Sequence, residues 1–578
     1  MAAEVFCERC YDWLGQGLTL KTEEIMMKRW SVCMAAVTAA ALISVTGCTV
    51  GSRENENDSG DAAGAGAEGQ SGGENSEFPT TFGSGQFDKE TIKVMIYDRN
   101  SAPEGMTAIN NRWTEYVNEK MSTVGIQVEF VAIPRSGDVE KIQTMMASGT
   151  APDLVMTYNG AMANDYYRQG GLYDLSPYID GDGQAENLKT YVGLDIIDIG
   201  RDNDGALYAV PARRSIAARS NMFIRKDWLD QLGLEIPETT EELYTALKAF
   251  KENNPDGVNN VVPFASYDIG NCKADVLSMA FSKLNPDTDV YYANLPFPAY
   301  NDEGFVEYLR FLNRLYNEGL MDREYYAEGN SEQTRKELFV NGQLGFYVTN
   351  VNGNVDSVRG ELLQNLRANH PGADMVSIPP LKNIYDGVQY NDGYTPNGAF
   401  VFIPKTCKNP EAAITYLDWL ATEEGGFALF HGFEGEHYVN EDGIPVVKDA
   451  AYNATDKDWL RHDIFMVGNQ GYYRSEDDFI RATAKEIPGY ESYVTENYMN
   501  AISGTVLADS AYTSPTQIDK ASDLSIVQDE HLVKCITCKA EDFDSAVADY
   551  RAALKSAGAE DVFAERAQYY LDNPSVAR

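Results

Sequence analysis

Apolar and polar residues alternate over 92–96 and again over 126–130, which is the pattern of half-buried β-strands. Between them, apolar residues in 106–117 recur at helical spacing, and a second helical face follows over 139–146. Residues 152–156 form a short apolar run that favours a buried strand. The order strand, helix, strand, helix, strand predicts an α/β fold with a mostly parallel, helix-covered sheet.

The carboxyl ends of such strands are where ligands bind in α/β sheets. Tyr97 and Asp98 follow the first predicted strand, and Tyr158 and Asn159 follow the third. We therefore expect Tyr158 and Asn159 to contribute to a ligand-binding site.

A second α/β region begins near residue 221. A strand is predicted over 221–224, and Thr239 to Glu242 fits the capping box that starts a helix. Another helix is predicted after Asn409-Pro410. The sequence shows no internal repeat.

The N-terminal region predicts export. Residues 26–47 contain a short basic start, an uncharged apolar run and small residues, as in a secretory signal peptide. The phrase Val45-Thr46-Gly47-Cys48 resembles the lipobox of bacterial lipoproteins, which implies that Cys48 is the lipidated mature N-terminus. A short uncleaved membrane anchor is the alternative.

The segments on either side of this signal carry no core-forming pattern. Residues 1–25 are interpreted as an upstream extension from a mis-called start, so Cys7 and Cys10 have no role in the mature protein. Residues 48–88 begin with the lipidated Cys and continue as an acidic Gly/Ser-rich stretch, which we expect to be a disordered tether.

Composition narrows the choice of function. The 578 residues carry a net charge of −41, which argues against nucleic acid and against a polybasic membrane surface as partners. Outside the Gly/Ser-rich stretch the chain contains no G-x-S-x-G motif, it contains no H-E-x-x-H motif, and its 5 His are scattered. We therefore predict that the protein is not an enzyme. Cys535 and Cys538 form a lone C-x-x-C, which suits a small disulfide but lacks the second pair of a zinc site.

Six phrases spread over the chain carry a resemblance. They are SGTAPDL at 148–154, GLYDLSPYI at 171–179, DGALYAVP at 204–211, IRKDWLDQLGL at 224–234, NEGLMD at 317–322 and GFEGEHY at 432–438. Together they resemble the extracellular solute-binding lipoproteins of carbohydrate ABC importers, in particular the large oligosaccharide- and aldouronate-binding type.

The resemblance implies a two-lobed, periplasmic-binding-protein-like fold of type II with a hinge between the lobes. It implies residues 89–211 plus 400–440 for the first lobe and residues 212–399 plus 441–578 for the second. The chain would cross between lobes near Pro211–Arg214, near Tyr394–Ala399 and after about Tyr438.

The implied function is the capture of an oligosaccharide by hinge closure and its delivery to a permease, with uronate-containing sugars among the candidate ligands. The implied partners are ABC permease subunits, and the membrane is contacted through the lipid anchor only, on the extracellular face of the cell membrane. We expect a monomer without a cofactor. A secreted glycan-active hydrolase and a lipoprotein sugar sensor remain as alternatives, because 88 acidic residues offer many carboxylate pairs.

Aromatic and arginine side chains are the candidates for sugar binding, because sugars stack on aromatic faces and Arg binds carboxylates bidentately. Trp113, Trp228 and Trp419 fit packing positions, whereas Trp459 lies outside any periodic run. The predicted ligand-binding residues are Tyr158, Asn159, Arg213, Arg214, Tyr267, Tyr394 and Trp459. Ion pairing with the many acids is the alternative for Arg213 and Arg214.

Residues 253–260 stand where many relatives carry an acidic loop that resembles a calcium site. Asp256 is the only carboxylate in this stretch, and Ca²⁺ requires several oxygen ligands. We therefore expect no bound metal there.

Overall fold

The computed structural model describes residues 87–181, 185–202, 204–265, 275–283, 292–326, 332–350, 361–508 and 512–572. The predicted upstream extension, the signal peptide, Cys48, all but the last two residues of the tether, and Tyr267 lie outside the described residues. The two largest hydrophobic cores organise the described chain, and we refer to the regions around them as the first and the second lobe; two smaller clusters lie around Phe223 and Tyr347 and around Tyr292 and Tyr570.

The first lobe is built on a mixed sheet whose parallel part follows the predicted order. Strands β1 (Glu90–Asp98) and β2 (Ile126–Pro134) pair in parallel, and a parallel bridge from Val94 to Leu154 joins β1 to the segment leading into β3 (Val155–Thr157). Strand β10 (Asn397–Phe402) runs antiparallel to β3 on one side and to β4 (Val210–Arg214) on the other. The short strand β13 (Gly468–Asn469) pairs in parallel with β4. The strands predicted at 92–96, 126–130 and 152–156 are thus confirmed.

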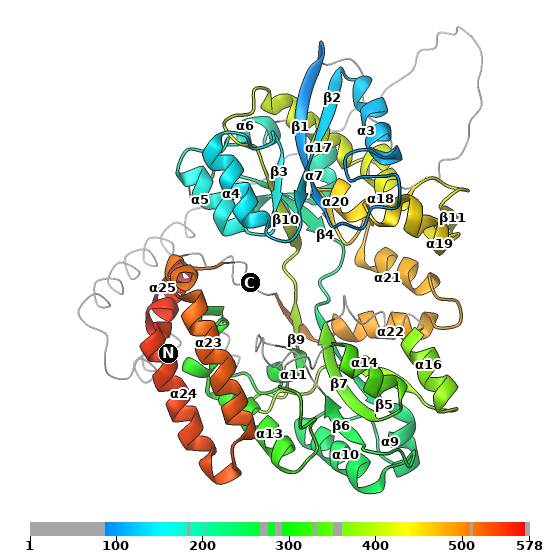
Figure 1. The fold of residues 1–578 in the computed structure, drawn as a ribbon, viewed down its shortest axis with the longest axis vertical. Coiled ribbons are helices and arrows are strands. Elements are labelled where there is room, and N and C mark those ends of the chain that lie inside the picture. Colours follow the sequence, from blue (N-terminus) through cyan, green and yellow to red (C-terminus); the bar gives the residue numbers. More distant parts are fainter. Residues whose placement is uncertain are drawn as a thin grey trace, which may run out of the picture. The chain divides into compact units, whose positions relative to one another are not determined.

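Helices cover this sheet because their apolar faces complete the first core (Figure 1). Helix α3 (Arg112–Ser122) begins with a capping box between Asn111 and Thr114 and buries Trp113. Helix α4 (Asp138–Ser148) ends at Gly149, whose φ of 68° suits glycine. The predicted helix after Asn409 is α17 (Pro410–Leu420), which buries Trp419. The remaining helices around this core are α5 (Gly160–Arg168), α6 (Ser176–Ile179), α7 (Glu186–Val192), α8 (Leu194–Asp198), α18 (Ala428–His431), α19 (Ala450–Asn453) and α20 (Arg461–Ile464).

The second lobe has a four-stranded sheet of order β6-β7-β5-β8. Its strands are β5 (Ser220–Arg225), β6 (Val262–Ala265), β7 (Leu344–Asn350) and β8 (Met375–Ile378), and β5 is antiparallel to both of its neighbours. All six residues of β5 are buried. Helices α9 (Lys226–Leu232) and α10 (Thr240–Asn253) follow, with the predicted capping box at Thr239 and Glu242 and with Trp228 in the core.

Late helices complete the second core. Helix α13 (Glu303–Asn317) packs against α23 (Pro515–Thr537), which is followed by α24 (Phe543–Ala557) and α25 (Ala559–Asp572). The side-chain amide of Asn313 donates to the carbonyls of Cys535 and Cys538 at 3.0 and 2.8 Å, and so satisfies the C-terminus of α23. Both thiols are free in this structure. Shorter helices α11 (Val276–Met279), α14 (Glu332–Val340) and α16 (Glu361–Asn369) flank the sheet.

Two neighbouring segments connect the lobes, as the predicted crossings near Pro211–Arg214 and Tyr394–Ala399 require. One leads from β4 to β5, and the other leads from β9 (Tyr390–Gly393) to β10. They are hydrogen-bonded to each other: Tyr394 N–H donates to the Ala217 carbonyl, and Arg214 N–H donates to the Pro396 carbonyl, both at 2.8 Å.

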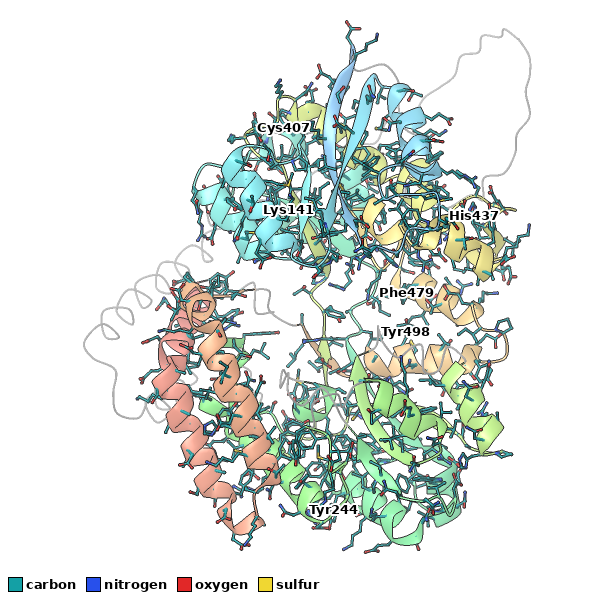
Figure 2. The ribbon with its side chains drawn as sticks, in the orientation of Figure 1. Lys141, Tyr244, Cys407, His437, Phe479 and Tyr498 are labelled. Atoms are coloured by element: carbon teal, nitrogen blue, oxygen red, sulfur yellow. The ribbon has the colours of Figure 1, made fainter. Side chains whose placement is uncertain are left out.

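The chain remains in the first core beyond residue 440, which the sequence analysis placed at the lobe boundary. Ile444, Leu460 and Phe465 all belong to that core. Helices α21 (Glu476–Lys485) and α22 (Glu491–Ala501) follow, packed through an edge-to-face contact of 5.2 Å between Phe479 and Tyr498 (Figure 2). Strand β14 (Thr505–Ala508) then pairs with β9. The third passage therefore begins later than the sequence suggested, because residues 441–473 form short elements without a clear apolar period.

Within the part of the chain that the structure describes, no helix is both long enough and apolar enough to cross a membrane.

Candidate functional site

Three side chains meet at the carboxyl ends of the parallel strands β1, β2 and β3. Tyr97 is the penultimate residue of β1, Arg135 follows β2 and Tyr158 follows β3. The rings of Tyr97 and Tyr158 stack at a centroid distance of 6.5 Å and an interplanar angle of 17°, and the Arg135 guanidinium lies 4.9 Å from both centroids. The predicted position of Tyr158 at the carboxyl edge of the sheet is confirmed by this contact with the end of β1.

The two tyrosines differ in what they offer to a ligand. Tyr97 is buried, and its hydroxyl donates to the carboxylate of Asp138 at 2.6 Å. Burial and that hydrogen bond raise the pKa of Tyr97. Tyr158 is 43% exposed, which is high for a ring that packs against another aromatic side chain. Tyr97 therefore supports the ring of Tyr158, and part of the Tyr158 side chain remains exposed to solvent.

A continuous chain of contacts leads from Tyr158 to the segments that connect the lobes. The Nδ2 of Asn469 donates to the hydroxyl of Tyr158 at 3.1 Å, and the Nη1 of Arg214 donates to the Oδ1 of Asn469 at 3.0 Å. The guanidinium of Arg214 then lies 4.2 Å from the ring centroid of Tyr394. The structure thus brings together three of the predicted residues, Tyr158, Arg214 and Tyr394.

The environment of Arg214 is unusual for an arginine in so acidic a chain. Its Nε donates to the carbonyls of Thr395 and Asn397, both at 3.2 Å, so each of its hydrogen-bond acceptors among the described residues is a neutral oxygen. Among the described residues, no Asp or Glu forms an ion pair with it. Burial lowers the pKa of Arg214 below the ordinary arginine value. A partly buried cation without a carboxylate partner is a strong candidate for ligand contact.

Trp459 lies in a segment that reaches the same end of the sheet. The hydroxyl of Ser101, just after β1, donates to the Trp459 carbonyl at 3.4 Å. One turn later, Asp463 accepts from Arg99 Nε and Nη2 at 2.6 and 2.8 Å. Asp463 and Arg99 both act electrostatically on Tyr158. The ring of Trp459 is partly buried against the first core, and its indole N–H has no partner among the described residues.

Two predicted residues have other roles in the structure, and a third lies outside the described part. Arg213 alternates with Arg214 along β4, so its side chain leaves the strand on the opposite side and donates to the carbonyls of Tyr191 and Arg474 at 3.1 and 3.0 Å. Asn159 is the N-cap of α5, and its Oδ1 accepts from Met162 N–H at 2.9 Å. Tyr267 lies in the undescribed stretch 266–274.

Sequence reasoning missed Asn469, Arg135, Arg99 and Asp463. Arg135 could have been found, because it follows the second predicted strand as Tyr158 follows the third. Asn469 belongs to a strand of two residues, which leaves no periodic signal in the sequence.

The loop around Asp256 does not offer the ligand set of a calcium ion. The Nη2 of Arg225 donates to an oxygen of Asp256 at 2.5 Å and to one of Asp227 at 2.7 Å, and the Arg225 side chain is 0% exposed. The amide of Asn254 is bonded to the backbone of Val258 through both its oxygen and its nitrogen. The described residues contain no cluster of three His, Cys, Asp or Glu that could hold a metal. The single carboxylate of the loop is therefore bound by an internal cation.

Comparison with known proteins identifies relatives along most of the chain. The sequence profile of a family described as "Bacterial extracellular solute-binding protein" matches residues 105–427. The polygalacturonan/rhamnogalacturonan-binding protein YtcQ of Bacillus subtilis (strain 168) is 24% identical over 434 residues, which are 72% of this chain and 80% of YtcQ. The fructooligosaccharide ABC transporter substrate-binding protein FusA of Streptococcus pneumoniae serotype 4 (strain ATCC BAA-334 / TIGR4) is 33% identical over 280 residues, covering 43% of this chain and 49% of FusA.

The fold is also found in solved structures. The alginate-binding protein AlgQ2, in its structure without calcium ion, aligns with a TM-score of 0.57 at 20% identity, over 84% of this chain and 99% of that protein. At this identity the likeness establishes the two-lobed α/β fold and nothing about the ligand.

Proposed function

Because the chain belongs to the bacterial extracellular solute-binding proteins, we propose that it is the ligand-capturing subunit of an ABC importer and that its ligand is an oligosaccharide. Relatives named for binding polygalacturonan and fructooligosaccharide support a saccharide ligand. The observation that carries the proposal is the contact chain Tyr158–Asn469–Arg214–Tyr394, which joins the end of the first sheet to the segments between the lobes.

The chemistry of this cluster suits a sugar. The exposed face of Tyr158 and the ring of Tyr394 provide surfaces on which a pyranose ring stacks, while hydroxyl and guanidinium groups bind its hydroxyls. The backbone of Trp459 reaches the same end of the sheet, and we include its partly buried ring as a further stacking surface. In this proposal the ligand contacts both lobes and therefore favours a closed arrangement, because only differential affinity shifts a two-state equilibrium.

The proposal includes an anchor and partners. Cys48 carries the lipid that holds the protein at the extracellular face of the membrane, and the tether to residue 88 separates it from the lobes. The protein acts as a monomer and delivers its ligand to permease subunits. Cys48→Ala is expected to release the protein into the medium or to leave it unprocessed, and equal lipid labelling of this variant would contradict the anchor.

A thermal-shift screen against neutral and acidic oligosaccharides tests the proposed ligand class, because a ligand that binds only the folded state raises the melting temperature. We expect at least one oligosaccharide to stabilise the protein without being degraded. Turnover of the sugar by purified protein would support a hydrolase instead.

Variants locate the site once a ligand is known. Tyr158→Ala and Trp459→Ala are expected to weaken sugar binding by about tenfold to a hundredfold, since a lost stacking or hydrogen-bonded contact costs about 1–3 kcal/mol. Tyr385→Ala is the matched control, because Tyr385 is a similarly exposed tyrosine of the second lobe outside the contact chain. Unchanged affinity in both site variants, measured by calorimetry, would show that the site lies elsewhere.

A further inference from the structure

Asn469 is held in place by the backbone around it. It pairs with Arg214 in the register of β13 and β4, and its carbonyl accepts from Ser215 N–H at 3.1 Å. Gly398 on β10 leaves the space that its side chain occupies: a Cβ at Gly398 would lie 2.5 Å from the Cβ of Asn469. The position of this amide is therefore determined by two neighbouring strands.

The orientation of the amide follows from its partners. Arg can only donate hydrogen bonds, so the Oδ1 of Asn469 must face Arg214, and Nδ2 must face Tyr158. The hydroxyl of Tyr158 then accepts from Nδ2 and keeps its own hydrogen for another acceptor. Arg214 uses Nε and one hydrogen of Nη1, and its Nη2 donates to none of the described residues. Both side chains thus retain donors for a ligand.

Arg214 differs in its partners from three nearby arginines. Each of these three has a carboxylate partner: Arg99 with Asp463 at 2.6 Å, Arg135 with Asp138 at 3.3 Å and Arg219 with Asp392 at 3.6 Å. Arg214 is held by three neutral oxygens instead.

We propose that Asn469 is the specificity-determining residue of this site: by holding Arg214 through a neutral amide, it reserves the guanidinium charge for a carboxylate on the saccharide. The inference rests on the proposed function and narrows the ligand to acidic oligosaccharides. A ligand carboxylate that accepts from Nη1 and Nη2 of Arg214 supplies the negative charge that no described Asp or Glu provides. An aspartate at position 469 would occupy that place permanently.

The test compares sugars that differ only in charge. Trisaccharides of galacturonic, glucuronic and mannuronic acid are titrated by calorimetry beside their carboxyl methyl esters, which keep the size and stereochemistry but remove the negative charge. We expect at least one free acid to bind the wild-type protein more than about tenfold more tightly than its ester. Its affinity is expected to fall as salt is raised, because salt screens the charge.

Asn469→Asp is the decisive variant. Its carboxylate pairs with Arg214, so the affinity for the acid should fall by more than about tenfold while the affinity for the ester changes little. Asn469→Ala removes the contact with Tyr158 but keeps the charge of Arg214, so it should bind both sugars more weakly and still prefer the acid. Far-ultraviolet circular dichroism and the unliganded melting temperature check that both variants fold.

The outcomes separate the two proposals. Equal wild-type affinity for acids and esters, or binding of neutral oligosaccharides alone, would overturn the inference and leave the proposed function intact. If the protein bound no saccharide, the proposed function itself would be contradicted. If Asn469→Asp fails to fold, the wild-type comparison of acid and ester, with its salt dependence, still decides the ligand charge.

Discussion

Two arginines, the half-buried Arg214 and the fully buried Arg225, lie eleven residues apart in sequence and show how differently the two lobes use the same side chain. Arg214 ends β4 of the first lobe and is bound by neutral oxygens of Thr395, Asn397 and Asn469. Arg225 ends β5 of the second lobe and is bound by the carboxylates of Asp227 and Asp256.

The difference lies in where the counter-charge comes from. Arg225 is fully compensated inside the protein, and its guanidinium also lies 4.3 Å from the ring centroid of Trp228. Burial favours the protonated form of Asp256, but the hydrogen bond and charge of Arg225 outweigh it, so the pKa of Asp256 lies below its ordinary value. Arg214 has no such partner among the described residues, and burial lowers its pKa. The charge of Arg225 is therefore neutralised within the second lobe, where it contributes to stability. The charge of Arg214 in the first lobe is not neutralised by a carboxylate of the described residues.

Replacing Arg225 should have the largest effect. Arg225→Met leaves two partly buried carboxylates without their cation, and breaking a buried ion pair from one side costs about 3–5 kcal/mol. Urea denaturation is expected to show a loss of free energy of unfolding of this order. Arg214→Met is the matched control and should cost less than Arg225→Met, since it leaves three neutral oxygens and no carboxylate without a partner. Equal losses of free energy of unfolding in the two variants would show that Arg225 and Arg214 do not differ in their contribution to stability.

Arg214→Met should instead affect the ligand. We expect the affinity for an acidic oligosaccharide to fall by about tenfold to a hundredfold, in line with about 1–3 kcal/mol for a charge-assisted contact. Calorimetry at fixed salt measures this change. Arg213→Met, on the neighbouring position of β4, is expected to leave the preference for acid over ester unchanged, because the Arg213 side chain lies on carbonyls of Tyr191 and Arg474.

The free energy of unfolding at acidic pH gives a further test of how Arg225 is compensated. A carboxylate whose folded pKa is lowered stabilises the protein above its unfolded pKa of about 3.9, and this contribution disappears as the pH falls through the folded pKa. Between pH 5 and pH 3 the wild-type protein should therefore lose more free energy of unfolding than Arg225→Met. A steeper loss in the variant would show that Arg225 does not lower the pKa of Asp256.

Chelation should have the smallest effect. Because Arg225 already binds the carboxylate of the 253–260 loop, neither EDTA nor added Ca²⁺ should shift the melting temperature. A decrease of several degrees with EDTA that Ca²⁺ reverses would show that a metal, and not Arg225, neutralises this loop.

Much of the fold could be predicted because regular elements leave a period in the sequence. The strands at 92–96, 126–130 and 152–156 and the capping box at Thr239 are found as predicted. Residues 441–473 could not be assigned correctly to a core, since short helices and two-residue strands carry no period. Their place in the first core depends on contacts such as Phe465 with Tyr191, at a centroid distance of 5.9 Å.

The site was predictable where topology alone positions a residue. The end of a parallel strand placed Tyr158 beside Tyr97, and the connection between lobes placed Arg214 beside Tyr394. The sequence could not distinguish Arg213 from Arg214, because their roles depend on which side of β4 each faces. It could not find Asn469 at all, because that residue is 255 positions from its partner Arg214.

The composition of the two cores has a consequence for the order in which the protein is completed during synthesis. The first core takes residues from Ile92 to Ala501, whereas the second begins at Met222 and includes Leu554 and Val562. A ribosome working from the N-terminus therefore supplies every part of the first core some sixty residues before the last part of the second. Until α23 and α24 have been synthesised, the apolar face of α13 that packs against them remains uncovered and is open to non-native contacts. Folding of the newly made chain can therefore be completed only when the C-terminal helices pack onto the second core.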